Sequence, residues 1–259
     1  MSGWQALADE VARWRDAGRI AELWWRDDDA FDGGPALDRL LAIARDVEMP
    51  LALAVVPAQA TAALAGRLSE EPAVDVLQHG YAHANHAVAP EKKVELGLQR
   101  PAMMVLGELG TGWMALERLF GSRALAVMVP PWNRIAPVLV STLPEIGYRG
   151  LSTFGPRPRV HPVRGLLQVN THVDLIDWKG GPTFAGEEAA LAALVTALAR
   201  ARAGDGEPVG ILSHHLAMDA GAWDFLRSLW ERMTRLENVR VRSARELFAP
   251  EAGRQGGRG

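Results

Sequence analysis

The chain has 259 residues, 48% of them hydrophobic, and a formal net charge of −3. This length suffices for one α/β barrel or two smaller domains, and the apolar content suffices for a full core. A near-neutral charge argues against a nucleic-acid partner, because binding to phosphates needs a basic surface. The absence of cysteine excludes disulfides and cysteine-ligated zinc.

The beginning of the chain lacks a basic region followed by an apolar run, so the sequence predicts no signal peptide. No stretch is apolar for long enough to cross a bilayer. We therefore expect a cytoplasmic protein without a membrane partner. Its oligomeric state is left open by the sequence.

Short β-like segments alternate with longer helical segments along the chain. Residues 51–56 are apolar throughout, which is typical of a strand buried on both faces. The proline-rich residues 155–162 predict a loop. In chain order, the expected elements are a helix at 3–17, a strand at 23–26, a helix at 35–46, a strand at 51–56, a helix at 59–68, a strand at 74–77, helical residues 91–120 with a break near Gly110, a strand at 125–129, a helix at 136–145, strands at 148–151 and 166–169, a helix at 187–203, a strand at 209–212, a helix at 223–236, a strand at 239–241 and a helix at 243–248.

Repeated strand–helix units predict parallel strands with helices outside them, in a barrel or a doubly wound sheet. No change of composition marks a second domain. We therefore expect residues 1–249 to form one α/β domain. The Gly/Arg-rich residues 250–259 are expected to be a disordered tail.

Polar residues follow five of the expected strands. In a barrel of parallel strands the carboxyl ends share one rim, where catalytic groups collect. The convergence of five segments on that rim is harder to explain by chance than any single motif. The residues are Asp27, Asp28 and Asp29, then His79 and His83, then Pro131 and Trp132, then Asp174 and Asp177, and finally His214 and His215.

Asp27, Asp28 and Asp29 form a run of like charges that is unfavourable at a strand end, and a nearby cation would remove the repulsion. Two histidines four residues apart, together with a carboxylate, form a common ligand set for a borderline divalent ion such as zinc. The two features together predict a metal site.

The order of the motifs resembles the polysaccharide deacetylase family, the carbohydrate esterases with a NodB-type homology domain. The resemblance spans residues 23–215 and implies an irregular (β/α)7-type barrel. The residues that carry it are Asp28-Asp29, His79 with His83, Pro131-Trp132, Asp174-x-x-Asp177-Trp178 and Leu212-Ser213-His214.

The resemblance also implies one divalent metal ion, zinc in the first place and cobalt or nickel as alternatives. Its ligands would be Asp29, His79 and His83. Asp28 would be the general base that activates a metal-bound water, and His214 the general acid that protonates the leaving amine.

Two further sets of residues complete the implied site. Asp174 or Asp177 would orient the general acid, as an acidic partner does in other triads. Pro131, Trp132 and His215 are candidates for contact with the substrate, although Trp132 could equally pack against the rim.

The sequence departs from the family pattern where it has Val129, because the family usually has an arginine there that tethers the base. Arg26 or Arg134 could supply that charge. Gly80 stands where the family prefers serine or threonine, and Ala30 where it prefers glycine.

The register of two motifs stays open at this point. Asp27 and Asp28 form an alternative acidic pair, although Asp27 is expected to face solvent or to cap the next segment. His215 competes with His214 for the role of the acid.

We therefore expect a metal-dependent hydrolase of non-peptide C–N bonds that removes an N-acyl group, most simply acetyl, from an amino sugar or glycoconjugate. One alternative is a metal-dependent amidohydrolase acting on a small non-sugar amide or imide. Another is a catalytically inactive carbohydrate-binding relative. Val129 in place of the family's arginine motivates both alternatives.

Overall fold

The computed structural model describes residues 2–249, so the expected tail at 250–259 lies outside the described residues. Its parallel strands are β1 (Ala21–Ala30), β2 (Leu51–Val55), β3 (Val74–His79), β4 (Ala124–Val129), β5 (Gly150–Leu151), β6 (Leu167–Gln168), β7 (Thr171–Asp174), β10 (Val209–Ser213) and β11 (Val239–Val241). The helices are α1 (Gly3–Asp16), α2 (Pro35–Asp46), α3 (Ala62–Leu68), α4 (Ala102–Phe120), α5 (Pro137–Thr142), α6 (Glu187–Ala203), α7 (Ala220–Met233) and α8 (Ala244–Leu247). A separate antiparallel pair consists of β8 (Ile176–Asp177) and β9 (Thr183–Phe184).

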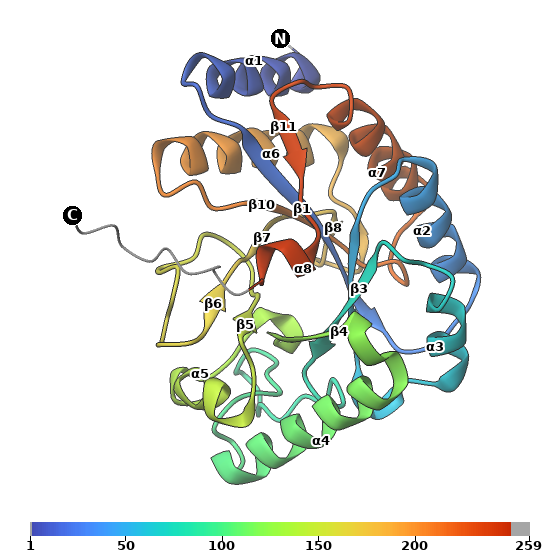
Figure 1. Ribbon diagram of the computed structural model, residues 1–259, viewed down its shortest axis with the longest axis vertical. Helices are drawn as coiled ribbons and strands as arrows, with labels where there is room; N and C mark the ends of the chain where they lie inside the picture. Colours follow the sequence, from blue (N-terminus) through green and yellow to red (C-terminus); the bar gives the residue numbers. More distant parts are fainter. Residues whose placement is uncertain (1, 250–259) are drawn as a thin grey trace, which may run out of the picture.

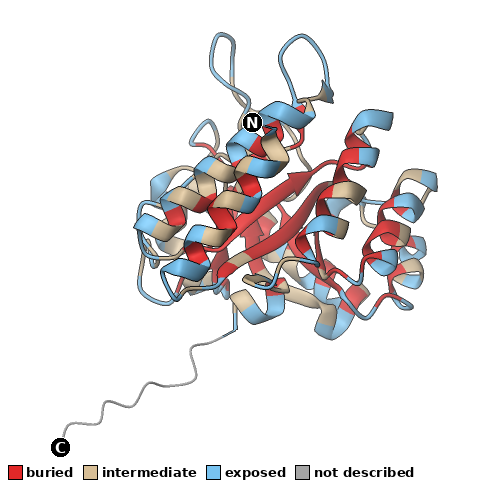
Figure 2. Cartoon of the chain, turned by 90° about the horizontal axis from the view of Figure 1, so that it is seen from above, coloured by how far each residue is buried: buried red, intermediate tan, exposed pale blue. Residues whose placement is uncertain are grey.

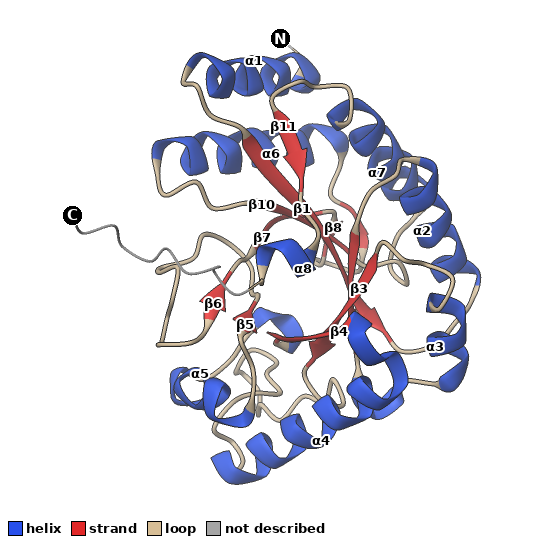
Figure 3. Cartoon of the chain, in the orientation of Figure 1, coloured by secondary structure: helices blue, strands red, loops and turns tan. Residues whose placement is uncertain are grey.

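The parallel strands form one nine-stranded sheet that curls into an incomplete barrel, with most helices outside it (Figures 1 and 3). The strand order is β6-β5-β4-β3-β2-β1-β10-β7, and β11 pairs with the beginning of β1. A bridge between Phe154 and Thr171 joins the segment after β5 to β7, so the two ends of the sheet approach each other. The expected irregular barrel of βα units is confirmed.

The strands are buried between the barrel interior and the outer helices (Figure 2). Trp24 points into the interior, where it packs with Ala52 and Leu77. Its neighbour Trp25 belongs to the core beneath the helices and lies 5.7 Å from Trp230, measured between ring centroids. Because side chains alternate along a strand, Arg26 and Asp28 face the interior as Trp24 does.

The short helix α8 fills the amino end of the barrel. In Figure 1 it lies in the middle of the ring of strands. Its Ala244 and the following Phe248 pack with the interior residues, and the Phe248 ring meets the Trp24 ring edge-on at 6.2 Å. This packing leaves the carboxyl ends of the strands as the open end of the barrel.

Several predicted elements differ from the observed ones. The prediction of helix from residue 91 is wrong, because residues 91–101 form an irregular segment and α4 begins only after Pro101. The predicted break near Gly110 is also wrong, since α4 runs without interruption to Phe120. β7 was not predicted as a strand, although it delivers Asp174 to the rim.

Within residues 2–249, no helix is both long enough and apolar enough to cross a membrane.

Candidate active site

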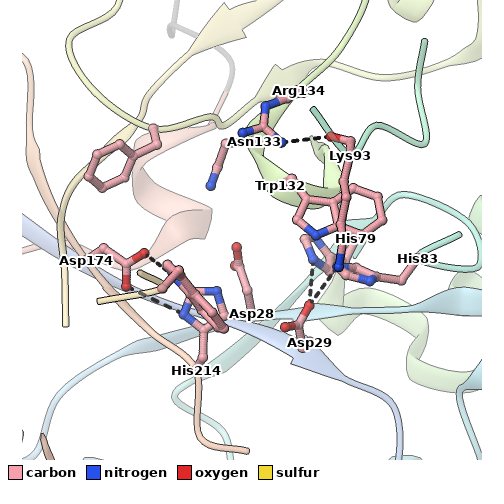
Figure 4. A pocket seen from close by; sticks show the side chains of 12 residues that line it. Asp28, Asp29, His79, His83, Lys93, Trp132, Asn133, Arg134, Asp174 and His214 are labelled. Atoms are coloured by element: carbon pink, nitrogen blue, oxygen red, sulfur yellow. Dashed lines mark hydrogen bonds and ion pairs between the residues drawn. The ribbon is translucent and has the colours of Figure 1, made fainter. Parts of the chain in front are cut away.

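A cavity of about 420 Å³ opens at the carboxyl ends of the strands. Such a volume lies within the usual range for small-molecule sites. It gathers side chains from β1, from the loops after β3 and β4, from β7 and from the loop after β10 (Figure 4). The residues predicted from sequence that line it are Asp28, Asp29, His79, His83, Trp132, Asp174 and His214.

The register between β1 and β10 decides which of the adjacent acids and histidines reach the cavity. Asp27 lies opposite Ser213 in this parallel pair. Because both strands alternate, Asp27 and Ser213 share the side that faces the helices, and the next residues turn to the interior. Asp28 and His214 therefore line the cavity, whereas Asp27 and His215 do not.

Asp27 and His215 form a buried pair behind the cavity wall. The Asp27 carboxylate accepts hydrogen bonds from the Ser213 hydroxyl at 2.6 Å and from the His215 backbone N–H at 3.0 Å, and it contacts the His215 ring nitrogen Nδ1. Burial opposes protonation of His215, but the Asp27 charge raises its pKa overall. The expectation that Asp27 faces solvent is wrong. His215 binds Asp27 and does not line the cavity, which corrects its prediction as a substrate contact.

Asp29, His79 and His83 form the candidate metal centre. The Asp29 Oδ1 atom lies 3.0 Å from His79 Nε2 and 3.1 Å from His83 Nε2. One ligand atom from each residue lies within 4.8 Å of the others. Two imidazole nitrogens and one carboxylate oxygen are a donor set that suits zinc, with positions left over for water and substrate.

The hydrogen bonds and charges of this cluster favour a positive charge between Asp29 and the two histidines. The His79 Nδ1 atom lies 3.0 Å from the Val129 carbonyl oxygen and donates to it, so the Nε2 of a neutral His79 presents a lone pair to the Asp29 carboxylate. Burial opposes charge on His79, yet the neighbouring carboxylates raise its pKa. Burial would raise the pKa of Asp29, but the two histidines lower it strongly. Protons or a divalent cation satisfy such a cluster, and the residues therefore fit a metal ion.

Backbone strain concentrates around the same cavity. In the described part of the chain five non-glycine residues have a positive φ, and four of them line the cavity. This conformation is costly for residues with a Cβ and tends to persist where the surroundings fix it for function. The four are Asp29, His83, Trp132 and Asn133.

Arg26 lies in the barrel interior and forms an ion pair with Asp28. Its guanidinium donates to both carboxylate oxygens, from Nε at 2.7 Å and from Nη2 at 2.9 Å. The remaining donors reach the Ser152 hydroxyl, the Asn133 side-chain oxygen and the Thr153 carbonyl. Both partners of the ion pair are buried. Arg26 thus supplies the charge that the sequence lacks at Val129.

His214 and Asp174 face each other on the other side of Asp28 from the metal cluster (Figure 4). The His214 Nδ1 atom lies 3.7 Å from Asp174 Oδ1, and the Trp178 indole N–H donates to Asp174 Oδ2 at 2.9 Å. Burial raises the pKa of Asp174, and the nearby His214 opposes that rise. Asp177 is exposed and accepts from the Lys179 backbone N–H, so Asp174 and not Asp177 lies beside the histidine.

The proline-aromatic pair divides between two roles. Trp132 lines the cavity and its ring lies 4.4 Å from the His83 ring, measured between centroids. Pro131 is buried against Gly80 and does not line the cavity, which corrects its prediction as a substrate contact. Arg134 donates to the Lys93 carbonyl and does not bind Asp28, so Arg26 is the residue that binds it.

Glu95 is a site residue that the sequence analysis missed. Its buried carboxylate accepts hydrogen bonds from the backbone N–H groups of Tyr81 and Ala82, between the two histidines, and of Ala84, directly after the second. A Cβ on Gly80 would lie only 2.0 Å from Glu95 Oε2. Because position 80 is glycine and not serine or threonine, the Glu95 carboxylate has room to bind the backbone of this loop.

The sequence matches no protein-family model and no curated protein. Solved structures nevertheless share its fold. One comes from Mycobacterium smegmatis and is itself only provisionally assigned as a polysaccharide deacetylase; its TM-score is 0.66 at 16% identity, with 89% of this chain and 90% of that one covered. A second is the Bc1960 peptidoglycan N-acetylglucosamine deacetylase, with a TM-score of 0.57 at 16% identity and coverage of 89% and 88%. A third is a family 4 acetyl xylan esterase from Clostridium thermocellum in complex with a cobalt ion, with a TM-score of 0.51 at 15% identity and coverage of 88% and 90%.

These identities are low, so the likeness establishes the fold. The chain has the barrel of the polysaccharide deacetylases and family 4 carbohydrate esterases, in a sequence that has diverged far from theirs. The resemblance predicted from the motif order is thereby confirmed at the level of structure.

Replacement of Gly80 by serine, the type of residue that the family prefers there, should weaken the metal site. Gly80 has a φ of 57°, and a Cβ would clash with Glu95 and with Pro131, so the loop between the histidines must shift. We expect zinc affinity to fall by about 10- to 100-fold, as when other supports of metal ligands are lost. Competition with a chromogenic chelator measures it. Gly33→Ser is the matched control, because nothing lies within 4 Å of its Cβ position; equal zinc affinities of the two variants would contradict the role of Gly80.

The Arg26–Asp28 pair should show strong energetic coupling. Arg26→Met leaves a buried carboxylate without its partner, which should cost about 3–5 kcal/mol of unfolding free energy. The double variant Arg26→Met/Asp28→Asn should lose less than the sum of the two single losses. Urea unfolding of the metal-free proteins measures all four states of the cycle. Single losses that simply add in the double variant would show that the pair is not coupled.

Proposed function

We propose that the protein is a metal-dependent hydrolase that removes an N-acyl group, most simply acetyl, from an amino sugar or glycoconjugate. The observation that carries the proposal is the placement of Asp28 between two groups in one cavity. On one side lie two histidines and a carboxylate with the donor set of a zinc site, and on the other lies His214 beside Asp174. The fold shared with carbohydrate deacetylases and esterases supports the same reaction class.

Asp29, His79 and His83 would hold the divalent ion. When bound, such an ion supplies Lewis acidity that polarises a carbonyl and favours ionisation of water. The Val129 carbonyl fixes the tautomer of His79, because it accepts the hydrogen bond of Nδ1 and leaves Nε2 free as a ligand atom.

Asp28 takes the proton of the attacking water in this proposal. Arg26 holds both carboxylate oxygens, so the side chain cannot rotate away from the cavity. Water oxygen adds to the acyl carbon and the C–N bond then breaks. His214 gives a proton to the departing nitrogen, so that the products are a carboxylic acid and an amine.

Asp174 positions His214. Its carboxylate is itself fixed by the Trp178 indole N–H and by the Ile176 backbone N–H at 3.0 Å. The Trp178 ring meets the His214 ring edge-on at 4.8 Å, which limits the rotation of the imidazole. The His214 ring thus packs against Trp178, and its Nδ1 atom lies 3.7 Å from Asp174 Oδ1, beyond hydrogen-bond distance.

The alternatives of a non-sugar substrate and of an inactive relative both rested on Val129. Arg26 makes a bidentate contact to the base in place of an arginine at position 129. Val129 therefore no longer favours either alternative over the deacetylase.

The proposal predicts acetate release from N-acetylated amino sugars by the zinc-loaded protein. Asp28→Asn should lower this turnover by about a hundredfold or more, because the proton acceptor is lost. It should retain zinc, since Asp28 is not in the ligand set. Acetate release from an N-acetylglucosamine oligomer and from an acetyl ester, compared with the ring opening of cyclic imides, separates the substrate classes.

Asp32→Asn serves as the matched control, because Asp32 is an exposed carboxylate on the loop after β1 that does not line the cavity. Turnover of the imides alone would replace the sugar substrate with a small amide. Turnover that survives in Asp28→Asn would remove Asp28 from the mechanism.

A further inference from the structure

Two cationic side chains line the cavity without a carboxylate partner. Lys93 and Arg134 both belong to its wall, on the side of Trp132 (Figure 4). Among residues 2–249 neither makes an ion pair. The Arg134 side chain makes one hydrogen bond, from Nη1 to the Lys93 carbonyl at 2.8 Å, and the Lys93 Nζ atom lies 6.0 Å from the centroid of the Trp132 ring.

The backbone holds these two residues next to each other. Beyond the Arg134–Lys93 bond, Leu96 and Ile135 form a parallel bridge, and the Ala136 N–H donates to the Leu96 carbonyl at 2.8 Å. Glu95 ties the same segment to the loop of the metal-binding histidines. The cationic pair is thus built into the frame of the site.

The carboxylates of the cavity do not neutralise this pair. Asp28 is bound to Arg26, Asp29 lies between the two histidines, and Asp174 lies beside His214. Each acid therefore has a cationic or proton-bearing partner of its own. Lys93 and Arg134 leave surplus positive charge on one wall, although the whole chain carries a net charge of −3.

We infer that the substrate carries an anionic group, a phosphate or a carboxylate, that binds to Lys93 and Arg134. The inference rests on the proposed function and narrows it to acidic N-acylated amino sugars. The guanidinium retains free N–H donors for an oxyanion, and the ammonium adds a second charge. Phe154 and Trp132 offer apolar faces on the same cavity for the sugar ring.

Binding in the absence of turnover tests the inference. Zinc-loaded Asp28→Asn is titrated calorimetrically with N-acetylglucosamine, N-acetylglucosamine 6-phosphate and N-acetylmuramic acid. At least one acidic sugar should bind roughly tenfold or more tightly than the neutral sugar, and added salt should reduce the difference. Preference for the phosphate or for the carboxylate identifies the source of the anion.

Lys93→Gln and Arg134→Gln, each made in the same background, should abolish most of this preference while the neutral sugar binds as before. Lys92→Gln is the matched control, because Lys92 is adjacent to Lys93 and is exposed as Lys93 is, but does not line the cavity. Equal or absent binding of neutral and acidic sugars, or a preference that persists in both glutamine variants, would overturn the inference.

A second measurement guards against a failure of Asp28→Asn to fold. The ratio of kcat/KM for acidic over neutral N-acetyl sugars is measured in the wild type and in Lys93→Gln. A high ratio that falls in the variant supports the anion site, and a ratio near one contradicts it. Turnover of neutral sugars alone would support the hydrolase and contradict the anion site. Tight binding of acidic sugars without turnover would support the anion site and contradict the hydrolase.

Discussion

Three consecutive carboxylates at the end of β1 are the constraint on which this structure depends. Each is satisfied in a different direction. Asp27 is bound by Ser213 and His215 behind the cavity wall, Asp28 by Arg26 inside the barrel, and Asp29 by the two histidines at the rim. Buried like charges at such spacing are tolerated only when each has its own partner. The site follows from the way the three are separated.

Alternation along the strand performs this separation. Arg26 and Asp28 lie on the interior face of β1, whereas Asp27 faces the helices, and the positive φ of Asp29 turns its side chain towards the histidines. The base and its guanidinium partner thus come from one strand, two residues apart. The chain has valine at position 129 and still binds its base with a guanidinium, because side chains two residues apart on one strand share a face.

Much of the site could be predicted from sequence, because the motifs lie at strand ends and strand ends meet at one rim. The choice between Asp27 and Asp28, and between His214 and His215, also follows from alternation once Trp24 is placed inside the barrel. Glu95 could not be predicted, because its role depends on hydrogen bonds to backbone groups 11 to 14 residues away in an irregular segment. Residues 91–101 have a helix-forming composition that tertiary contacts override, so the sequence predicts helix where the structure is irregular.

The metal content of the purified protein tests the central claim most directly, because it asks whether the third carboxylate is satisfied by a cation. Elemental analysis compares the wild type with His83→Ala, in which one of the three ligands is removed. The account predicts about one equivalent of zinc, cobalt or nickel per chain in the wild type and its loss in the variant. No metal in the wild type after reconstitution, or full retention in His83→Ala, would contradict it.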